Sequence, residues 1–257
     1  MALSQSCVNS GGPASLIRLD RVPRLEEEIS LSATARAALT CWQARPGEVL
    51  TVIDPTTTAY RARMSSVAPE HAVCVPFQRL PGPVESPLRI EVYQSLPDKE
   101  RFELVLQKLT ELGVARIVPL ESQHSITLDE RDAQQKKSHR WPDVISKASR
   151  QCRRAMLPEL MPVHTFAEAL AGATATELKL MLYEGDVLWS FTEGVGSFRP
   201  QSVALLVGPE GGFSPVEVAD AQAVGFLPVR LGPRILRTET AAIVATALLQ
   251  SYLGDLN

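Results

Sequence analysis

The stretch "SVALLVGPEGGFSPVEV" (202–218) leads from an apolar segment through a glycine-rich turn into a helix start. Its apolar segment is typical of a parallel strand that is buried on both faces. Ser214, Pro215 and Glu217 supply a capping hydroxyl, a first-turn proline and a glutamate three positions after the cap, which together predict a helix N-terminus. Because open α/β sheets bind ligands where strands end and helices begin, the turn either holds a ligand or only connects two elements. A lone glycine-rich turn favours the plain connection.

The segments around this stretch alternate between strand and helix patterns. Apolar runs bounded by turn residues predict strands, and apolar residues three and four positions apart predict helices. We expect strands at 88–96, 115–120, 177–185, 202–208 and from 226, and helices at 98–113, within 130–154, at 165–172, and after 214 and 237. Such alternation predicts an α/β domain with a mainly parallel sheet.

A different pattern precedes the proline-rich segment "RLPGPVESP" (79–87). There, "EVLTVID", "AYRARMSSV" and "HAVCVPF" are short β-prone runs separated by turn residues, which predict a small β-barrel or sandwich. We therefore expect two domains joined by a linker. The expected boundaries are a loose tail at 1–19, a β domain at 20–80, a linker at 81–87 and the α/β domain at 88–257.

Composition limits the function further. The 257 residues carry a formal net charge of -3, so any contact with nucleic acid must come from a local basic patch. The four cysteines lie far apart with no CxxC pair, and we expect neither a metal site nor disulfides. We expect no signal peptide before the first domain, and no apolar run reaches the ~18 residues of a membrane span. The sequence predicts a cytoplasmic protein.

A second motif follows the opening stretch. "FLPVRLGPRILRTETAAIVATALLQ" (226–250) reads as a strand, a turn and a long helix that is apolar almost all round. Such a helix is expected to be buried in the core or against a second subunit. The turn carries Arg234 and Arg237, and guanidiniums beside a buried element need partners. Structural ion pairs would satisfy them, but two turns of this kind after two strands favour a ligand site between the turns.

These two motifs resemble the signature of a known family. "GPEGGFSPVEV" (208–218), followed about 20 residues later by "LGPRILRTETAA" (231–242), is similar to the RsmE family of 16S rRNA (uridine-N3) methyltransferases, which belong to the SPOUT class. "ESPLRIEV", "QKLTELGVARIVPLES" and the closing "GDLN" also resemble family segments. The resemblance implies a PUA-like β-barrel for RNA, then an α/β domain with a deep trefoil knot. It also implies a homodimer.

The cofactor implied by the resemblance is S-adenosyl-L-methionine, held in the knot mainly by backbone groups. Glycines allow the main chain to approach the cofactor closely, and leucine and isoleucine side chains provide apolar walls. The implied cofactor-binding residues are Leu182, Tyr183, Glu184, Val207, Gly208, Gly211, Leu231, Gly232, Ile235, Leu236 and Thr240.

Methylation of uridine N3 requires that the nitrogen lose its proton while it attacks the methyl group. Arg237 is the expected catalytic residue that stabilises charge on a uracil carbonyl. Glu239, with Glu210 as an alternative, is the expected base. The other interpretation of Glu239 is a first-turn helix residue favoured by the helix dipole.

A basic segment at 131–154 is the candidate RNA surface, and it includes Lys136 and Lys137. Lys147, Arg150 and Arg154 have the i, i+3, i+7 spacing of one helix face and are expected to contact phosphates. Arg21 and Arg24, in the "RVPR" segment that is similar to the basic start of the family, are expected to join them. The alternative is an ordinary solvated helix face.

Some positions depart from the family pattern on the RNA side. Thr40 and Gln43 stand where arginines are usual, His124 replaces an arginine, and Arg153 replaces a glycine. These departures affect target recognition more than cofactor binding. From the two motifs we expect an S-adenosylmethionine-dependent methyltransferase of uridine N3 in 16S rRNA that acts within the small ribosomal subunit. The alternatives are another SPOUT RNA methylation, on ribose 2′-O or another base, and a non-catalytic RNA- or cofactor-binding relative.

Overall fold

The computed structural model describes residues 9, 11–97, 99–133, 138–185 and 189–256 and divides into two compact units. The β unit comprises Asn9–Glu85 and Ile145–Glu159, and the α/β unit comprises Ser86–Val144 and Leu160–Asn257. The boundary after Glu85 falls inside the segment expected as a linker. Residues 145–159, which were expected in the α/β domain, belong instead to the β unit.

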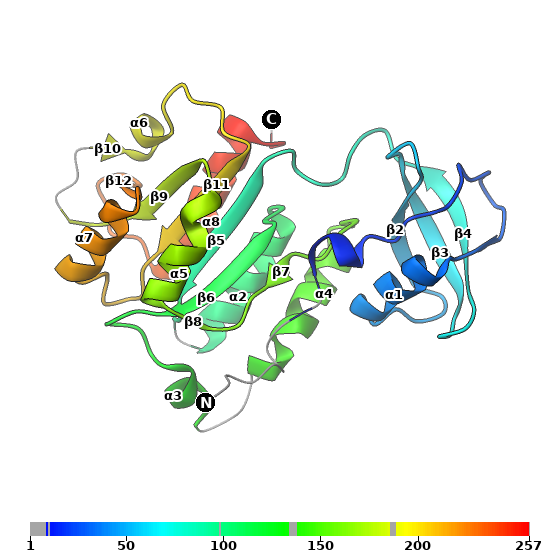
Figure 1. Cartoon of the computed structure of the whole chain (residues 1–257), viewed down its shortest axis with the longest axis horizontal. Helices are drawn as coiled ribbons and strands as arrows, with labels where there is room; N and C mark the ends of the chain where they lie inside the picture. Colours follow the sequence, from blue (N-terminus) through cyan, green and yellow to red (C-terminus); the bar gives the residue numbers. More distant parts are fainter. Residues whose placement is uncertain (1–8, 10, 98, 134–137, 186–188, 257) are drawn as a thin grey trace. The chain divides into compact units, whose positions relative to one another are not determined.

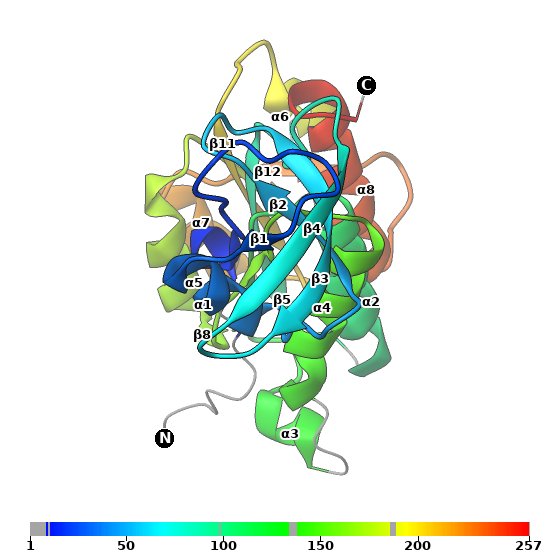
Figure 2. The ribbon, with the colours of Figure 1, turned by 90° about the vertical axis from the view of Figure 1, so that its right-hand side faces the viewer.

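The β unit is built on a four-stranded antiparallel sheet (Figure 2). In spatial order its strands are β1 (Ile29–Ser30), β4 (Ala72–Arg79), β3 (Ala59–Val67) and β2 (Val49–Ile53). The sequence did not predict the helix α1 (Ala33–Cys41), which contributes Ala35, Ala38 and Leu39 to the buried core. Trp42, just after this helix, is fully buried in the same core and donates its indole N–H to the Ser15 carbonyl oxygen at 2.7 Å.

The expected loose tail is wrong over residues 11–19. The chain there forms a 3-10 turn, η2 (Gly12–Ser15), and then runs along β2, where Leu19 N–H donates to Ile53 O at 2.8 Å and Ile53 N–H donates to Ile17 O at 2.9 Å. The side chains of Ile17 and Leu19 are buried in the β-unit core. These backbone bonds join residues more than 30 positions apart, so no local pattern in the sequence reveals them. Residues 1–8 and 10 lie outside the described residues.

The α/β unit contains the mainly parallel sheet that the sequence predicts, since the pairs from β10 to β6 and the pair of β6 with β8 are all parallel. Short β8 (His164–Thr165) lies beside β6. In spatial order, the other strands of this sheet are β10 (Trp189–Ser190), β12 (Leu227–Arg230), β9 (Leu178–Leu182), β11 (Ser202–Val207), β5 (Arg89–Ser95), β6 (Arg116–Glu121) and β7 (Glu159–Leu160).

Helices cover both faces of this sheet (Figure 1). α5 (Phe166–Gly172) and α7 (Pro215–Ala223) pack on one face, and α2 (Lys99–Glu111) and α8 (Thr238–Leu253) pack on the other. The capping box predicted before α7 is confirmed: the Ser214 hydroxyl accepts from Glu217 N–H at 3.3 Å, and Glu217 Oε2 accepts from Ser214 N–H at 2.9 Å. The helices α3 (Leu128–Asp132), α4 (Trp141–Gln151) and α6 (Phe191–Val195) are also present.

α8 is only partly buried within the chain. Ala242, Ala245 and Leu249 are fully buried, whereas Tyr252 is 47% exposed. A flank of apolar side chains is half-buried: Ile243, Val244, Ala247 and Leu248. None of the helices seen in the described residues has both the length and the apolar character of a membrane span.

Candidate active site

A cavity of about 540 Å³ lies at the carboxyl ends of three neighbouring strands. Its walls are the loops that follow β9, β11 and β12, at 182–185, 207–213 and 229–238, together with Arg101 of α2 and Ala241 of α8. The volume is typical of a cofactor or small-molecule site, for which roughly 300–1,000 Å³ is usual. The two sequence motifs therefore meet at one site, as the sequence predicts for ligand-binding turns of an open α/β sheet.

Most of the predicted site residues line this cavity, although their roles stay predictions. Gly211, Glu239 and Thr240 do not line it. Those that do are Leu182, Tyr183, Glu184, Val207, Gly208, Leu231, Gly232, Ile235, Leu236 and Arg237.

Gly211 has a packing role, while its cofactor contact stays a prediction. A Cβ at this position would lie 2.8 Å from the Cβ of His124, closer than side chains tolerate. His124 Nδ1 also lies 3.2 Å from Gly212 O, and Glu217 Oε1 accepts from Gln123 N–H at 2.8 Å. The missing side chain of Gly211 thus allows the 122–125 turn to pack directly against the glycine-rich loop. Gly208 lines the cavity, so a ligand contact at this glycine stays a prediction.

A buried chain of hydrogen bonds joins the loops to the sheet. Gln94 of β5 donates from Nε2 to the Thr238 hydroxyl at 3.0 Å, and that hydroxyl donates to Gly208 O at 2.5 Å. Gln94 and Thr238 are buried. The first residue of α8 is therefore fixed to the end of β11. Gln94 was not predicted from the sequence, because it lies 144 positions from its partner and has no motif around it.

Thr238→Val is expected to loosen both the fold and the site, because it removes the hydroxyl while keeping the shape of the side chain. Gly208 O then loses a buried donor and Gln94 loses its acceptor, which predicts a loss of about 1–3 kcal/mol in the free energy of unfolding. Urea unfolding gives the stability, and titration calorimetry with S-adenosylmethionine gives the affinity, which should fall as well. Thr174→Val, at an exposed helix-end threonine, is the matched control. Equal behaviour of the two variants would show that the hydroxyl chain does not support the loop.

Arg101 connects the two candidate bases. Its Nη1 donates to Glu210 Oε1 at 2.6 Å, and its Nε lies 4.0 Å from Glu239 Oε1. The Glu239 side chain is 12% exposed, and its Oε2 is buried without a hydrogen-bond partner in the described part of the chain. Arg101 lies on α2, far in sequence from both motifs, and the sequence analysis missed it. One guanidinium therefore holds Glu210, which lines the cavity, and Glu239, which does not.

Three arginines line the cavity with exposed side chains, namely Arg230, Arg234 and Arg237. The sequence suggested buried partners for Arg234 and Arg237, but water can solvate both. Neither side chain forms a hydrogen bond or ion pair with another described residue. These guanidiniums can therefore donate to an anionic molecule that enters the cavity. In the described residues, no group of three or more His, Cys, Asp or Glu side chains could hold a metal ion.

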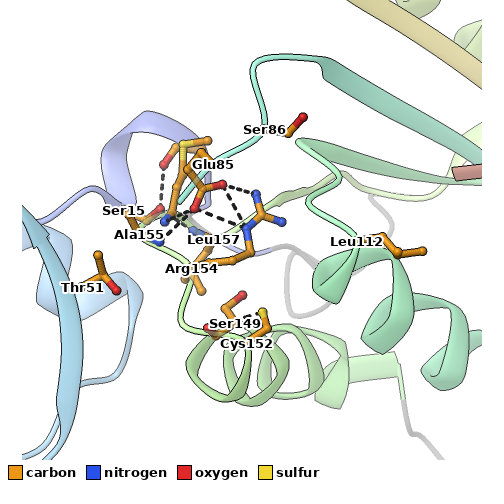
Figure 3. Close-up of polar contacts among 12 residues, drawn as sticks. Ser15, Thr51, Glu85, Ser86, Leu112, Ser149, Cys152, Arg154, Ala155 and Leu157 are labelled. Atoms are coloured by element: carbon orange, nitrogen blue, oxygen red, sulfur yellow. Dashed lines mark hydrogen bonds and ion pairs between the residues drawn. The ribbon is translucent and has the colours of Figure 1, made fainter. Parts of the chain in front are cut away.

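The RNA stripe expected on the 131–154 segment is wrong in part, because two of its three members are used within the β unit. The Arg154 side chain is only 4% exposed and is ion-paired with Glu85 at 2.7 Å (Figure 3). Arg150 donates to the Trp42 carbonyl and lies 3.7 Å from Glu48. Helical spacing gives the direction of a side chain but not its partners. Lys147 is exposed, as the prediction requires, and Lys136 and Lys137 lie outside the described residues.

Arg21 and Arg24 lie on an exposed turn of the β unit. Arg21 forms a 2.7 Å ion pair with Glu27, and this hydrogen-bonded carboxylate raises the pKa of Arg21. Such an exposed pair exchanges easily with a phosphate. Both residues are accessible to RNA.

Comparison with known proteins agrees with this fold and site. A family model described as the RNA methyltransferase domain matches residues 84–250, which span the strands of the parallel sheet and the cavity loops. The chain is 34% identical over 174 residues to a protein of Buchnera aphidicola subsp. Schizaphis graminum, covering 68% of this chain and 70% of the relative. It is 30% identical over 204 residues to a protein of Bacillus subtilis, covering 76% of this chain and 78% of the relative. Both relatives are named ribosomal RNA small subunit methyltransferase E.

Solved structures extend the similarity to the β unit. A putative methyltransferase of Legionella pneumophila in complex with the cofactor S-adenosylmethionine matches with a TM-score of 0.67 and 35% identity over 94% of this chain and 99% of that one. A ribosomal RNA small subunit methyltransferase E of Neisseria gonorrhoeae, bound to S-adenosylmethionine, matches with a TM-score of 0.64 and 29% identity. The match covers 94% of this chain and 98% of that one. The chain belongs to the RNA methyltransferase family, in the group of ribosomal RNA small subunit methyltransferase E.

Proposed function

We propose that this protein transfers a methyl group from S-adenosylmethionine to N3 of a uridine in 16S rRNA. The observation that carries the proposal is the convergence of three strand-end loops, both motifs included, on one cavity in a chain of this family. Relatives at about a third identity carry the name of a small-subunit rRNA methyltransferase, and two similar structures hold the cofactor. The substrate is rRNA within the small ribosomal subunit, which places the activity in the cytoplasm.

The cavity fits S-adenosylmethionine in size and chemistry. Leu182, Val207 and Leu236 provide apolar walls, while Glu184 and Glu210 bring carboxylates to the lining that suit a cationic ligand. The strand-end loops offer backbone N–H and C=O groups for the adenine and ribose. When bound, the cofactor supplies an electrophilic methyl group on a sulfonium.

The residues of the chain then position and polarise the uracil ring. Arg237 donates hydrogen bonds to the carbonyl oxygen where negative charge develops as N3 loses its proton. We infer that Glu210, rather than Glu239, accepts that proton, because Glu210 is the one of these two carboxylates that lines the cavity. Arg101 keeps both carboxylates oriented. The cavity loops hold the reacting groups in line.

We infer a deep trefoil knot from the path of the chain. β12 is separated from β11 by β9, yet α8, which follows β12, starts with Thr238 bonded to Gly208 at the end of β11. The loop 231–237 must therefore cross the end of β9 to reach the middle of the sheet. A knot would close around this crossing. We further infer that the β unit is a PUA-like barrel that binds RNA.

We also infer a homodimer, and the half-buried flank of α8 supports it. Its apolar side chains Ile243, Val244, Ala247 and Leu248, with Tyr252 at 47% exposure, form a continuous surface that a second copy would cover. Leu248→Arg is expected to convert the dimer into a monomer because it buries a charge at the interface. Sedimentation velocity measures the mass. A wild-type protein that sediments as a monomer at micromolar concentration contradicts the dimer.

The direct test of the function is methyl transfer from labelled S-adenosylmethionine to small subunits that lack the modification, followed by nucleoside analysis. The expected product is 3-methyluridine. A 2′-O-methylated or other base product would point to a different reaction of the same class. Cofactor binding without any labelled nucleoside would identify a non-catalytic relative, consistent with the unusual residues Thr40, Gln43 and His124.

A further inference from the structure

One face of the β-unit sheet contains a buried guanidinium. Strand alternation puts Leu50, Val52 and Met64 in the core and directs Thr51 and Arg61, which are cross-strand partners, to the opposite face. This face would ordinarily be solvated. Nevertheless Thr51 is fully buried and Arg61 is only 7% exposed.

Arg61 has neutral hydrogen-bond partners only. Its Nη1 donates to the Thr51 hydroxyl at 2.7 Å, and its Nη2 donates to Val49 O at 3.3 Å. Burial lowers the pKa of Arg61, and the positive charge of Arg153 lowers it further. No carboxylate among the described residues pairs with this guanidinium. A buried charge without a counter-charge is costly and calls for an anion.

Arg153 provides a second guanidinium at the same place. The Thr51 hydroxyl, which accepts from Arg61, donates to Arg153 O at 2.9 Å, so one hydroxyl links the two residues. Arg153 has an exposed side chain and a φ of 65°, a left-handed conformation that favours glycine. Glycine is also the residue expected here from the family resemblance. The chain therefore keeps a charged side chain at a position whose backbone disfavours it.

We propose that Arg61 and Arg153 form a phosphate-binding site for the backbone of the RNA substrate. A phosphodiester supplies the missing counter-charge, and two guanidiniums can donate to its oxygens together. Arg63, on the same face two residues along β3, lies with its guanidinium carbon 5.8 Å from the centre of the Phe77 ring and extends the positive surface. This site is the contact that we propose between the β unit and the RNA substrate. The proposal therefore rests on the proposed function.

The test measures binding of a fluorescent small-subunit rRNA fragment by anisotropy over a range of KCl concentrations, without cofactor. Arg153→Gly removes the charge and suits the backbone at φ 65°, so the fold is preserved. We expect about tenfold weaker binding and a log–log salt slope smaller by about 1. Arg153→Lys should keep most of the affinity. Arg199→Ala, at an exposed arginine of the α/β unit, is the control and should change little.

A second arm separates phosphate from other anions. Inorganic phosphate, compared with chloride at equal ionic strength, should raise the melting temperature of the wild type more than that of Arg153→Gly. Equal RNA affinity and equal salt slope for the wild type and Arg153→Gly would overturn the proposal. Competition by polyglutamate but not by RNA would overturn it in favour of an acidic protein partner. Because no methyl transfer is measured, an Arg153-dependent affinity would stand even if the protein labelled no rRNA.

Discussion

Arg237→Ala is expected to lower kcat for methyl transfer by about 10²- to 10³-fold, the usual loss when one preorganised donor to a developing oxyanion is removed. The side chain lines the cavity, is exposed and is bound to no other described residue. Its removal should leave the free energy of unfolding unchanged. The affinity for S-adenosylmethionine should also change little, because the loop backbone and apolar walls stay in place. Single-turnover kinetics with labelled cofactor and small subunits measures the effect.

Arg237→Lys is the matched variant. Lysine keeps the positive charge but loses the planar fork, so we expect it to recover only part of the rate. A purely electrostatic role in RNA docking would instead give a raised KM, an unchanged kcat and near-complete rescue by lysine. Full activity of Arg237→Ala would remove this residue from the mechanism.

The elements that could be predicted from sequence are those with local signals. The fully apolar run 202–208 and the Ser214, Pro215 and Glu217 triplet predicted a buried strand and a capped helix, and both are present as β11 and α7. The strand-end position of the glycine-rich loop then located the cavity. Each of these signals acts within a few residues, because capping and hydrophobic periodicity are local effects.

The parts that were missed depend on contacts distant in sequence. Arg101 meets Glu210 across 109 positions, and Gln94 meets Thr238 across 144. Gly211 was assigned to the cofactor because its partner, the Cβ of His124, belongs to a turn 87 residues earlier. A spacing rule cannot find a partner that only the sheet topology brings close.

The basic stripe was predicted wrongly in part for the same reason, because helical spacing does not reveal the partner of Arg154. That partner also matters for the stability of the fold. Arg154 was predicted to meet phosphate but meets Glu85, whose carboxylate accepts hydrogen bonds from Arg154 Nε at 3.1 Å and Nη2 at 2.7 Å and from the backbone N–H groups of Ala155 at 2.8 Å and Met156 at 3.0 Å (Figure 3). A single carboxylate therefore neutralises a buried charge and ties the end of the segment Asn9–Glu85 to the segment Ile145–Glu159.

Glu85→Ala is accordingly expected to lower the free energy of unfolding by about 3 kcal/mol, the lower end of the range for removing one partner of a buried ion pair. The Arg154 side chain, 4% exposed, would keep its charge without a counter-ion, and two backbone donors would lose their acceptor. Chemical denaturation followed by tryptophan fluorescence measures the loss, since Trp42 is buried in the same unit.

Two further variants show whether the stability lost in Glu85→Ala comes from the unpaired buried charge of Arg154 or from a simple loss of contacts. Glu27→Ala removes the exposed partner of Arg21 and should leave stability nearly unchanged, because water takes the place of the carboxylate. Adding Arg154→Met to Glu85→Ala should recover part of the lost stability, because the double variant no longer buries an unpaired guanidinium. If the double variant is less stable than Glu85→Ala, the backbone bonds to Ala155 and Met156 and the packing of the arginine stem hold the two segments together, and the charge pair does not. In either case Arg154 acts within the fold, and the charge available to RNA on this segment comes from its exposed neighbours Lys147 and Arg153.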